Sequence, residues 1–525
     1  MHHRSLAVSF ILLILAFASV GQAQVTTGNV SGVVTAEGDA LPGVTIEVIH
    51  VPTNTHYSTV SGSNGRYIIP NARVGGPYRV AAQLEGFRPA EERDLEVRLG
   101  QTTEVPEIKM QLATVSEAIT VTATVDEIIN PNRTGASSAV SQEQIESLPT
   151  VNRSLQDFAR TNPYVNVDAG DPTGTRMTIA GKSNRYNNIQ IDGAVNNDLF
   201  GLADTGTPGG QADAPPISLD AIQELQLVVS PYDVRQGGFT GGGVNAVTRS
   251  GANDLQGSVF YSKRDASFVG DGPSDNPITD FDAEQYGGRL GGPILRDRLF
   301  FFVNAEVNDR SEPTGVSAEP GSDSLRADIA ALAARAQQIA MARYNHDTGT
   351  LGEFPQTKSS DNFFARLDWN LGSTNQFTLR HNYVDATRDV VSDRFFTRFR
   401  FPTSTYVFAD ETNSSVAQLN SALSASAFNE ARLSYTTIRD KRASRADFPA
   451  VEIGGASRNA QVILGSEQFS QANSLDQDIL EITDDMTWIR GAHTLTFGTH
   501  NELFDFKNLF LAPAFGYYFF PTIEE

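Results

Sequence analysis

From Gln256 onward, apolar and polar side chains alternate with a period of two residues, which is typical of β-strands that have one apolar face. The clearest pair of strands covers residues 363–371 and 377–383, joined by a turn at Gly372. Three similar pairs are predicted at residues 286–294 with 299–308, 419–423 with 431–435, and 480–488 with 495–497. The second half of the chain is therefore predicted to be a succession of antiparallel hairpins.

The connections between these strands alternate in length. Short turns near Arg296, Gly372, Asn429 and Gly491 take turns with long polar segments such as residues 310–360 and 439–474. An outer-membrane barrel has this asymmetry, because its periplasmic turns are short and its extracellular loops are long, whereas a soluble sandwich has no reason for it. We therefore predict roughly nine membrane-spanning strands in residues 254–525.

Two features lie in the predicted long loops. A helical run at residues 324–343 is predicted to be a surface feature of an external loop, outside the barrel wall. Six aromatic residues farther along are typical of a girdle at the membrane interface, and a folded loop core would give the same pattern. They are Phe395, Phe396, Phe399, Phe401, Tyr406 and Phe408.

The amino-terminal residues have the three parts of a secretory signal peptide. His2, His3 and Arg4 precede an apolar run over residues 6–18, and small residues follow up to Ala23. Cleavage is expected after Ala23, which assigns residues 1–23 to the signal. The alternative, a membrane anchor, is less favoured because the apolar run is shorter than the roughly 20 residues that a spanning helix needs.

Residues 24–113 contain short alternating strands separated by turn residues, which predicts a small antiparallel β-sandwich. The segments VSGVVTAEGDALPGVTIEV, SGSNGRYIIP and LEGFRP resemble the carboxypeptidase-regulatory-like domain, a prealbumin-type β-sandwich. The resemblance implies a spacer or interaction module, because no catalytic constellation lies in this segment.

Residues 114–125 form an extended stretch in which Ile119, Val121 and Ala123 alternate with threonines. Such a peptide can add to the edge of a partner's sheet through main-chain hydrogen bonds, although a plain linker strand has the same pattern. Residues 126–253 then show a mixed α/β pattern that is dense in glycine near its end. Its predicted helices are residues 141–147 and 155–160, and its predicted strands are 176–179, 188–191, 224–229 and 244–248.

Composition and charge exclude several classes of function. The chain has 525 residues with 40 basic and 62 acidic side chains, a formal net charge of −22, whereas a nucleic-acid binder needs a basic face. It has no cysteine, which excludes disulfides, zinc–cysteine sites and thiol catalysis. The histidines form no metalloprotease motif, and neither a phosphate-binding loop nor a nucleophile elbow occurs, so we predict no enzyme and no cofactor.

One acidic cluster offers oxygen ligands of the kind that calcium prefers. Its members are Asp271, Asp275, Asp280, Asp282 and Glu284. Their spacing is not that of an EF-hand loop, and a solvated acidic loop is the favoured interpretation, so no metal site is predicted.

The combined order of signal, sandwich, extended segment, glycine-rich domain and hairpins resembles a TonB-dependent outer-membrane receptor. Three segments resemble its Oar-like branch closely: IQIDGAVNNDLFGL at 189–202, ISLDAIQELQLVVSPYDVRQGGFTGGGVNAVTRSGAND at 217–254, and QYGGRLGGPILRDRLFFFVNAE at 285–306. The resemblance covers essentially the whole chain after the signal. It implies a mainly β protein with an N-terminal prealbumin-like sandwich, an α/β plug domain at 126–253 and a partial antiparallel transmembrane barrel.

The resemblance also implies functional segments and partners. The box that pairs with TonB would be Glu117, Ala118, Ile119, Thr120, Val121, Thr122 and Ala123. The IDG and LDAIQELQ elements would be the central strand and helix of the plug. The implied partners are the TonB-ExbB-ExbD complex, outer-membrane lipid and a small ligand such as a siderophore, an oligosaccharide or a peptide. The location would be the outer membrane of a Gram-negative bacterium, with the N-terminal domains in the periplasm.

The implied function is import of a scarce ligand across the outer membrane with energy from TonB. The alternative is an adhesin or structural barrel without active transport, which would not need the plug-like domain or the EAITVTA segment. Plugged transporters close with about 22 strands, so a count of roughly nine predicts that this chain is the N-terminal portion of a longer receptor or a truncated product.

Overall fold

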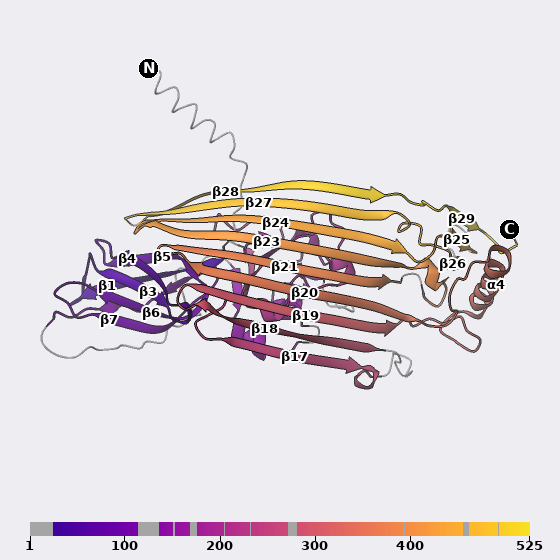
Figure 1. Cartoon of the computed structure of the whole chain (residues 1–525), viewed down its shortest axis with the longest axis horizontal. Coiled ribbons are helices and arrows are strands. Elements are labelled where there is room, and N and C mark those ends of the chain that lie inside the picture. The colour runs from indigo at the N-terminus through magenta and orange to yellow at the C-terminus, as the bar shows by residue number, and fades with distance from the viewer. Residues whose placement is uncertain are drawn as a thin grey trace, which may run out of the picture.

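The computed structural model describes residues 25–113, 136–150, 153–167, 176–203, 205–230, 233–270, 281–391, 394–454, 461–491 and 493–524. A β-sandwich lies at one end of the molecule, and a smaller unit with helix α4 lies at the other end (Figure 1). Between them, long strands run along the long axis of the molecule. No helix in the described part of the chain is long and apolar enough to cross a membrane. The predicted signal peptide, residues 1–23, lies outside the described residues.

The sandwich consists of two sheets. In the first, β1 (Thr27–Ala36) pairs with β2 (Asp39–Ala40), β5 (Arg66–Arg73), β8 (Thr102–Glu104) and β9 (Ile108–Lys109). In the second, the order is β4 (Thr55–Val60), β3 (Thr45–His50), β6 (Gly75–Gln83) and β7 (Ala90–Val97). Alternate residues of both sheets, including Val30, Ile46 and Val80, form one buried core between them, which confirms the predicted sandwich.

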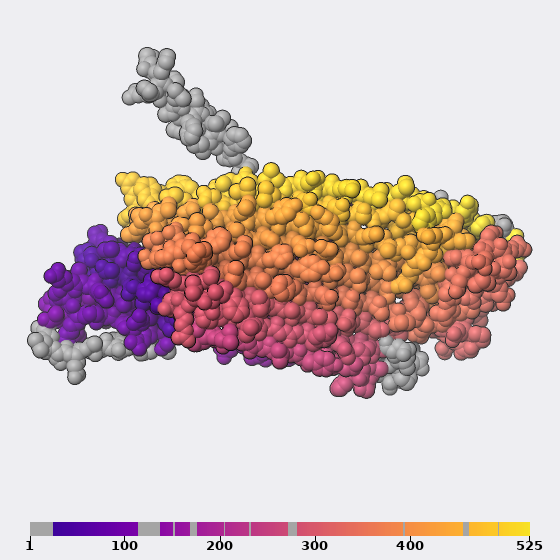
Figure 2. Space-filling model, in the orientation of Figure 1, coloured from indigo at the N-terminus to yellow at the C-terminus, as the bar shows by residue number. Residues whose placement is uncertain are grey.

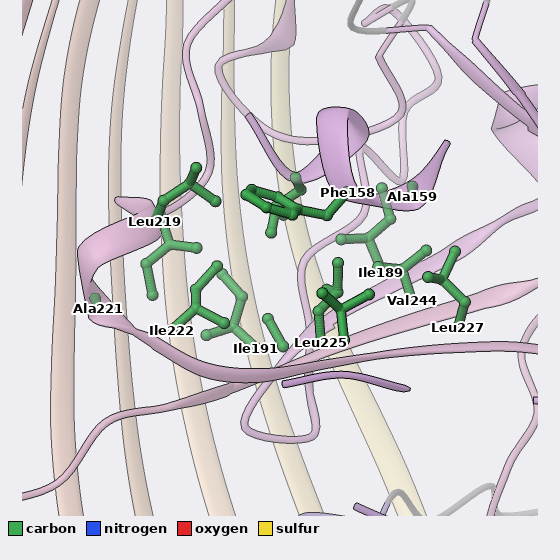
Figure 3. Packing of buried hydrophobic residues seen from close by; sticks show 14 of the residues in the cluster. Phe158, Ala159, Ile189, Ile191, Leu219, Ala221, Ile222, Leu225, Leu227 and Val244 are labelled. Atoms are coloured by element: carbon green, nitrogen blue, oxygen red, sulfur yellow. The ribbon is translucent and has the colours of Figure 1, made fainter. Parts of the chain in front are cut away.

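The second unit, which we call the plug, has a five-stranded sheet in the order β10-β15-β16-β13-β14. These strands are β10 (Ala136–Val140), β15 (Ile222–Ser230), β16 (Gly243–Thr248), β13 (Asn188–Ile191) and β14 (Ala194–Val195). Short elements cover the sheet: α2 (Gln142–Ser147), α3 (Leu155–Ala159), β11 (Val165–Val167), β12 (Met177–Ile179), η2 (Asn184–Tyr186), η3 (Gly210–Ala212) and η4 (Leu219–Ala221). Figure 3 shows Phe158 of α3 above Leu225, Ile189 and Val244 in the plug core.

Two details of the plug differ from the sequence-based expectation. The IDG element follows β13, which is second from one edge of the sheet, and the central strand is β16. The LDAIQELQ element is not a helix beyond the short 3₁₀ turn η4, because its residues from Ile222 onward join β15. The strand that the residue pattern predicted at 224–229 is confirmed, and the helix that the resemblance implied is wrong, because pairing on both sides, with β10 and β16, satisfies the backbone of this segment.

The third unit is a nine-stranded antiparallel sheet, which we call the wall. In order it contains β17 (Gln256–Asp265), β18 (Asp282–Leu295), β19 (Leu299–Pro313), β20 (Pro355–Asn370), β21 (Asn375–Val390), β23 (Tyr406–Ser424), β24 (Ala427–Ser444), β27 (Asn473–Arg490) and β28 (His493–Phe510). The predicted strand count is therefore confirmed. One predicted turn is wrong: Asn429 lies inside β24 opposite Ser421, and the turn falls at residues 425–426.

The two faces of the wall differ in chemistry. On β20, Phe363, Leu367 and Trp369 are 40–48% exposed on the outer face. On the inner face Phe364 and Asp368 are buried, and the Arg366 side chain is 10% exposed. The outer residues lie opposite Tyr383, Leu379 and Phe377 of β21, which continue the apolar surface. This alternation, apolar outside and polar inside, is that of an outer-membrane barrel.

The cap is the unit built from the long loops at one end of the wall. Its sheet has the order β22 (Phe399–Arg400), β26 (Val462–Leu464), β25 (Ala450–Ile453) and β29 (Tyr517–Phe520). Helix α4 (Ala327–Tyr344) lies outside the wall, as predicted, and buries Ile329 and Ala333 against Phe399 and Phe401. For these two phenylalanines the folded loop core is correct, and the aromatic girdle is wrong. The buried face of helix α4 is small, because three of its four buried residues are alanines, and the two phenylalanines complete the core of the cap.

We expect the fragment of residues 25–113 to fold alone, because its core cluster comes entirely from its own strands. Circular dichroism should show β-structure and a cooperative melt. Ile46→Ala removes a fully buried side chain and should lower the free energy of unfolding by about 2–5 kcal/mol. The half-exposed control Val60→Ala should change it by less than about 0.5 kcal/mol. A coil spectrum for the fragment would contradict this expectation.

Candidate functional site

The turn after β13 brings the sequence Ile191-Asp192-Gly193 to the contact between plug and wall. Asp192 and Gly193 both have left-handed backbone, with φ of 47° and 70°, which reverses the chain into β14. A side chain at position 193 would overlap the guanidinium group of Arg432 on the wall, so only glycine fits there. The motif therefore presents one carboxylate, that of Asp192, to the inner face of the wall.

The buried carboxylate of Asp192 joins the two units. Within the plug it accepts the backbone N–H of Thr248 at 2.8 Å and the Thr248 hydroxyl at 2.7 Å. From the wall, Nε of Arg380 lies 3.0 Å away and Nη1 of Arg366 lies 3.6 Å away. The same guanidinium groups donate to plug carbonyls, Arg380 to Ile191 at 2.5 Å and Arg366 to Thr248 at 3.0 Å. Charge-assisted hydrogen bonds thus fix the plug to β20 and β21.

Other polar contacts between plug and wall surround this ion-pair cluster. The Ser218 hydroxyl donates to Glu306 at 2.5 Å, and the Val195 N–H donates to Glu481 at 3.3 Å. On the wall, the side-chain amides of Asn362 and Asn382 donate to the carbonyls of Pro215 and Pro216 at 3.2 and 3.0 Å. These bonds satisfy polar groups that the contact buries, which a close fit between two polar surfaces requires.

The plug segment at residues 205–216 reaches toward the long-loop end of the wall. Its Asp213 carboxylate pairs with Arg388 at 2.7 Å and with Lys358 at 3.5 Å, two residues near the ends of their strands. Its Gln211 accepts a hydrogen bond from Arg442 at 2.8 Å. The segment is thereby held as the outermost surface of the plug.

A cavity of about 200 Å³ lies between this segment and β17–β20. Its lining mixes both signs of charge, with residues that include Asp213, Arg264, Asp309, Arg310 and Lys358. Such a lining suits a polar ligand that carries hydrogen-bonding groups of both kinds. Within the described ranges, no group of three or more histidine, aspartate or glutamate side chains is arranged to hold a metal ion.

The predicted TonB box, Glu117–Ala123, lies outside the described residues, between the sandwich and β10. Of the acidic cluster, Asp271, Asp275 and Asp280 also lie outside them. The remaining members, Asp282 and Glu284, stand on β18 and pair with Lys263 at 3.0 and 2.6 Å. Two carboxylates that share a lysine are already neutralised in part, which does not favour a cation site there.

Sequence reasoning did not identify the pairing of Asp192 with Arg366 and Arg380. The period-two pattern does place both arginines on the polar face of their strands, since their neighbours Leu367 and Leu379 point to the apolar face. A buried arginine on an inner face needs a counter-charge, and that signal was present in the sequence. The identity of its partner depends on where the plug sits, which no local pattern specifies.

Three family models match successive parts of the chain. The carboxypeptidase regulatory-like domain matches residues 29–111, and the TonB-dependent receptor plug domain matches residues 131–244. The outer membrane beta barrel domain matches residues 247–352 and 324–523, together more than half of the chain. The order of these domains agrees with the order of sandwich, plug and wall.

Two curated relatives and one solved structure are similar. The TonB-dependent transporter Oar of Myxococcus xanthus is 28% identical over 264 residues, which are 47% of this chain and 23% of Oar. The uncharacterized protein YddB of Escherichia coli K12 is 26% identical over 296 residues, which are 53% of this chain and 35% of YddB. The crystal structure of the outer membrane transporter YddB has a TM-score of 0.52 at 16% identity and covers 70% of this chain and 48% of that one.

The matched region is thus about a quarter to a third of the length of these curated relatives. The plug and outer membrane beta barrel models are those of Gram-negative outer-membrane receptors, so the chain is located in the outer membrane and is a receptor, not an enzyme. The chain belongs to the TonB-dependent outer-membrane receptor family, and within that family it resembles the Oar branch.

Proposed function

We propose that the chain acts in the import of a scarce polar ligand across the outer membrane, with energy delivered by TonB through the TonB-ExbB-ExbD complex. One observation carries the proposal: the plug is bound to the inner face of the wall through the buried Asp192, Arg366 and Arg380 cluster. A solute that follows the wall must displace the plug. Breaking a buried ion-pair cluster costs several kcal/mol, so displacement needs work from outside the molecule.

The proposed site of that work is residues 117–123, an extended segment that would pair as a strand with an edge of TonB. The next described plug element along the chain is β10, an edge strand that pairs only with β15 in the described residues. Tension on residues 117–123 would therefore act first on the pairing of Ala136–Val140. Val140 belongs to the plug core, so removal of β10 would also open that core.

The domain limits proposed for this function are 24–113 for the sandwich, 114–125 for the TonB segment, 126–253 for the plug and 254–525 for the barrel portion. The proposed ligand site is the cavity beside Asp213 and Lys358, and the proposed ligand classes remain a siderophore, an oligosaccharide or a peptide. The outer apolar face, with Phe363 and Trp369, is proposed to contact lipid. Mass spectrometry of small molecules that co-purify with the protein from outer membranes would identify the ligand.

Val121→Pro should weaken binding of the purified full chain to the periplasmic domain of TonB by at least about tenfold, because proline removes a backbone donor and fixes φ within the pairing segment. Biolayer interferometry gives the affinity. The matched control Ile128→Pro lies outside residues 114–125 and should bind as the unmodified chain does. Equal binding by Val121→Pro and the unmodified chain would place the TonB contact elsewhere.

Asp192→Asn should loosen the plug from the wall, because Arg380 would remain buried without its counter-charge while Arg366 keeps Asp368, at a cost of about 3–5 kcal/mol. Limited proteolysis across a urea series should show the plug cleaved at a lower urea concentration. The control Asp254→Asn changes an exposed carboxylate and should leave the midpoint unchanged. A double-mutant cycle with Arg380→Gln should give a coupling of about 1–3 kcal/mol, and zero coupling would contradict the assignment.

A further inference from the structure

The sandwich is docked on the short-turn end of the wall. Strand β4 faces the wall with every second residue: Thr55 accepts from Asn370 at 3.0 Å, Tyr57 donates to Gln376 at 3.3 Å, and Thr59 donates to the Ala425 carbonyl at 3.4 Å. These three wall residues lie in or beside the turns that follow β20 and β23. Figure 2 shows the sandwich in contact with this end of the molecule.

One sandwich side chain reaches inside the wall. At the end of β5, Arg73 donates to Asp368 at 3.1 Å and to the Ser250 hydroxyl at 2.9 Å. Asp368 is fully buried and also binds Arg366 at 2.8 Å. Since Arg366 lies 3.6 Å from Asp192, the sandwich and the plug are attached to one continuous set of charges.

The sandwich also binds the plug directly. Val25, Val74 and Leu99 pack on Val247 in a small apolar cluster. The Leu99 N–H donates to Glu224 of β15 at 2.8 Å, and the side-chain amide of Gln226 donates to the Leu99 carbonyl at 2.7 Å. The sandwich therefore contacts both units between which a solute would leave.

These contacts enclose a cavity of about 300 Å³ whose lining comes from all three units. The sandwich contributes Arg73, the plug contributes Asp192 and Thr248, and the wall contributes Arg380 and Val416. Val416 lies midway along β23, paired with Arg380, and is 2% exposed. The docked sandwich thus lies across the space between the plug and the short turns of the wall.

We propose that the sandwich is a second closure of the transport route, and that it must leave the short-turn end of the wall before a solute that has passed the plug can enter the periplasm. The proposal rests on the proposed import function for the solute, but the docking itself does not. Because Arg366 binds both Asp192 and Asp368, displacement of the plug frees Arg366 to compete with Arg73 for Asp368. Opening of the plug and release of the sandwich are therefore coupled.

The test uses the absence of native cysteine, which makes a single introduced cysteine a specific reporter. Val416→Cys is a near-isosteric change with no hydrogen bond to lose, and its reaction with a bulky polar maleimide in the purified full chain reports access to the cavity. Arg73→Glu sets a second carboxylate beside Asp368 and should speed labelling by about tenfold or more. Arg66→Glu, an exposed change on the same strand, should leave the rate unchanged.

Labelling that is as slow in Arg73→Glu as in the parent would overturn the proposal, as would fast labelling in the parent itself. A second measurement covers the case in which Arg73→Glu fails to fold. Thr55→Cys with Asn370→Cys places two thiols where side chains now touch, and oxidation should join sandwich to wall in high yield. Absence of the cross-link would show that the sandwich does not dock there.

The same preparations separate this proposal from the import function. If the cross-link forms and Val416→Cys is labelled slowly, but the unmodified chain does not bind the TonB domain, the closure stands and TonB-driven import is refuted. If the unmodified chain binds TonB normally, but no cross-link forms and Val416→Cys is labelled rapidly, the closure is refuted and TonB-driven import stands. Faster labelling of Val416→Cys when the TonB domain is added would support both the closure and TonB-driven import.

Docking should weaken as the pH rises. Burial raises the pKa of Glu224 to about 7, although the Leu99 N–H and Arg98 act to lower it, and nearby Glu96 adds to the rise. Because the pKa of Glu224 is higher in the docked state, its protonation stabilises docking. This stabilisation is complete at pH values below the ordinary pKa of 4.5 and is lost as the pH rises through about 7. Burial and Arg73 lower the pKa of His50 to about 3, so this residue stays neutral throughout.

Labelling of Val416→Cys should therefore rise by about tenfold or more between pH 5.5 and 8.5, after normalisation to a cysteine placed at exposed position 66. Glu224→Gln keeps an acceptor for the Leu99 N–H and cannot ionise, so it should remove the pH dependence. A normalised rate that does not change with pH in the parent would contradict this role for Glu224.

Discussion

The position of every functional part of this receptor depends on one buried carboxylate. Asp192 leaves the plug in a left-handed turn and meets Arg366 and Arg380 on the inner face of the wall. Asp192 and Arg380 are both buried, so each needs the other's charge to offset its lost hydration, whereas Arg366 is held by Asp192 and Asp368 together. The positions of these side chains are therefore closely constrained. Glycine at position 193 leaves room for the guanidinium group of Arg432 beside the turn.

The cavity toward the long loops and the cavity toward the short turns both follow from this placement. On one side, Asp213 of the plug is held by Arg388 and Lys358, which leaves the mixed-charge cavity beside them. On the other side, Arg73 of the sandwich shares Asp368 with Arg366. In the proposed import cycle, plug release and sandwich release are steps that one electrostatic network can link, because a change at Asp192 alters the partners available to Arg366.

The three units are stabilised by different physics. The sandwich and the plug bury apolar cores of their own, around Ile46 and Leu225 respectively. The wall exposes a large apolar face outside, as Trp369 illustrates, and depends on backbone pairing together with inner polar contacts and inner phenylalanines such as Phe364. Contacts between the units combine the ion pairs with small apolar clusters, such as Phe302 and Phe364 of the wall against the plug core and Val247 of the plug against the sandwich.

The sequence by itself determined the local structure and the family. A period of two fixed the hairpins, since a strand must present alternate residues to opposite faces, and the same alternation placed Arg366 and Arg380 inside the wall. The motifs of the plug identified the family before any contact was known. The local pattern was also right for the strand at residues 224–229, whereas the helix that the resemblance implied there is wrong, because the segment pairs with β10 and β16. Only the tertiary structure decided that Asp192 meets Arg380, that Phe399 belongs to a loop core and that Arg73 reaches Asp368. Each of these contacts joins residues far apart in the chain, and their partners depend on how whole units pack, which no spacing along the sequence encodes.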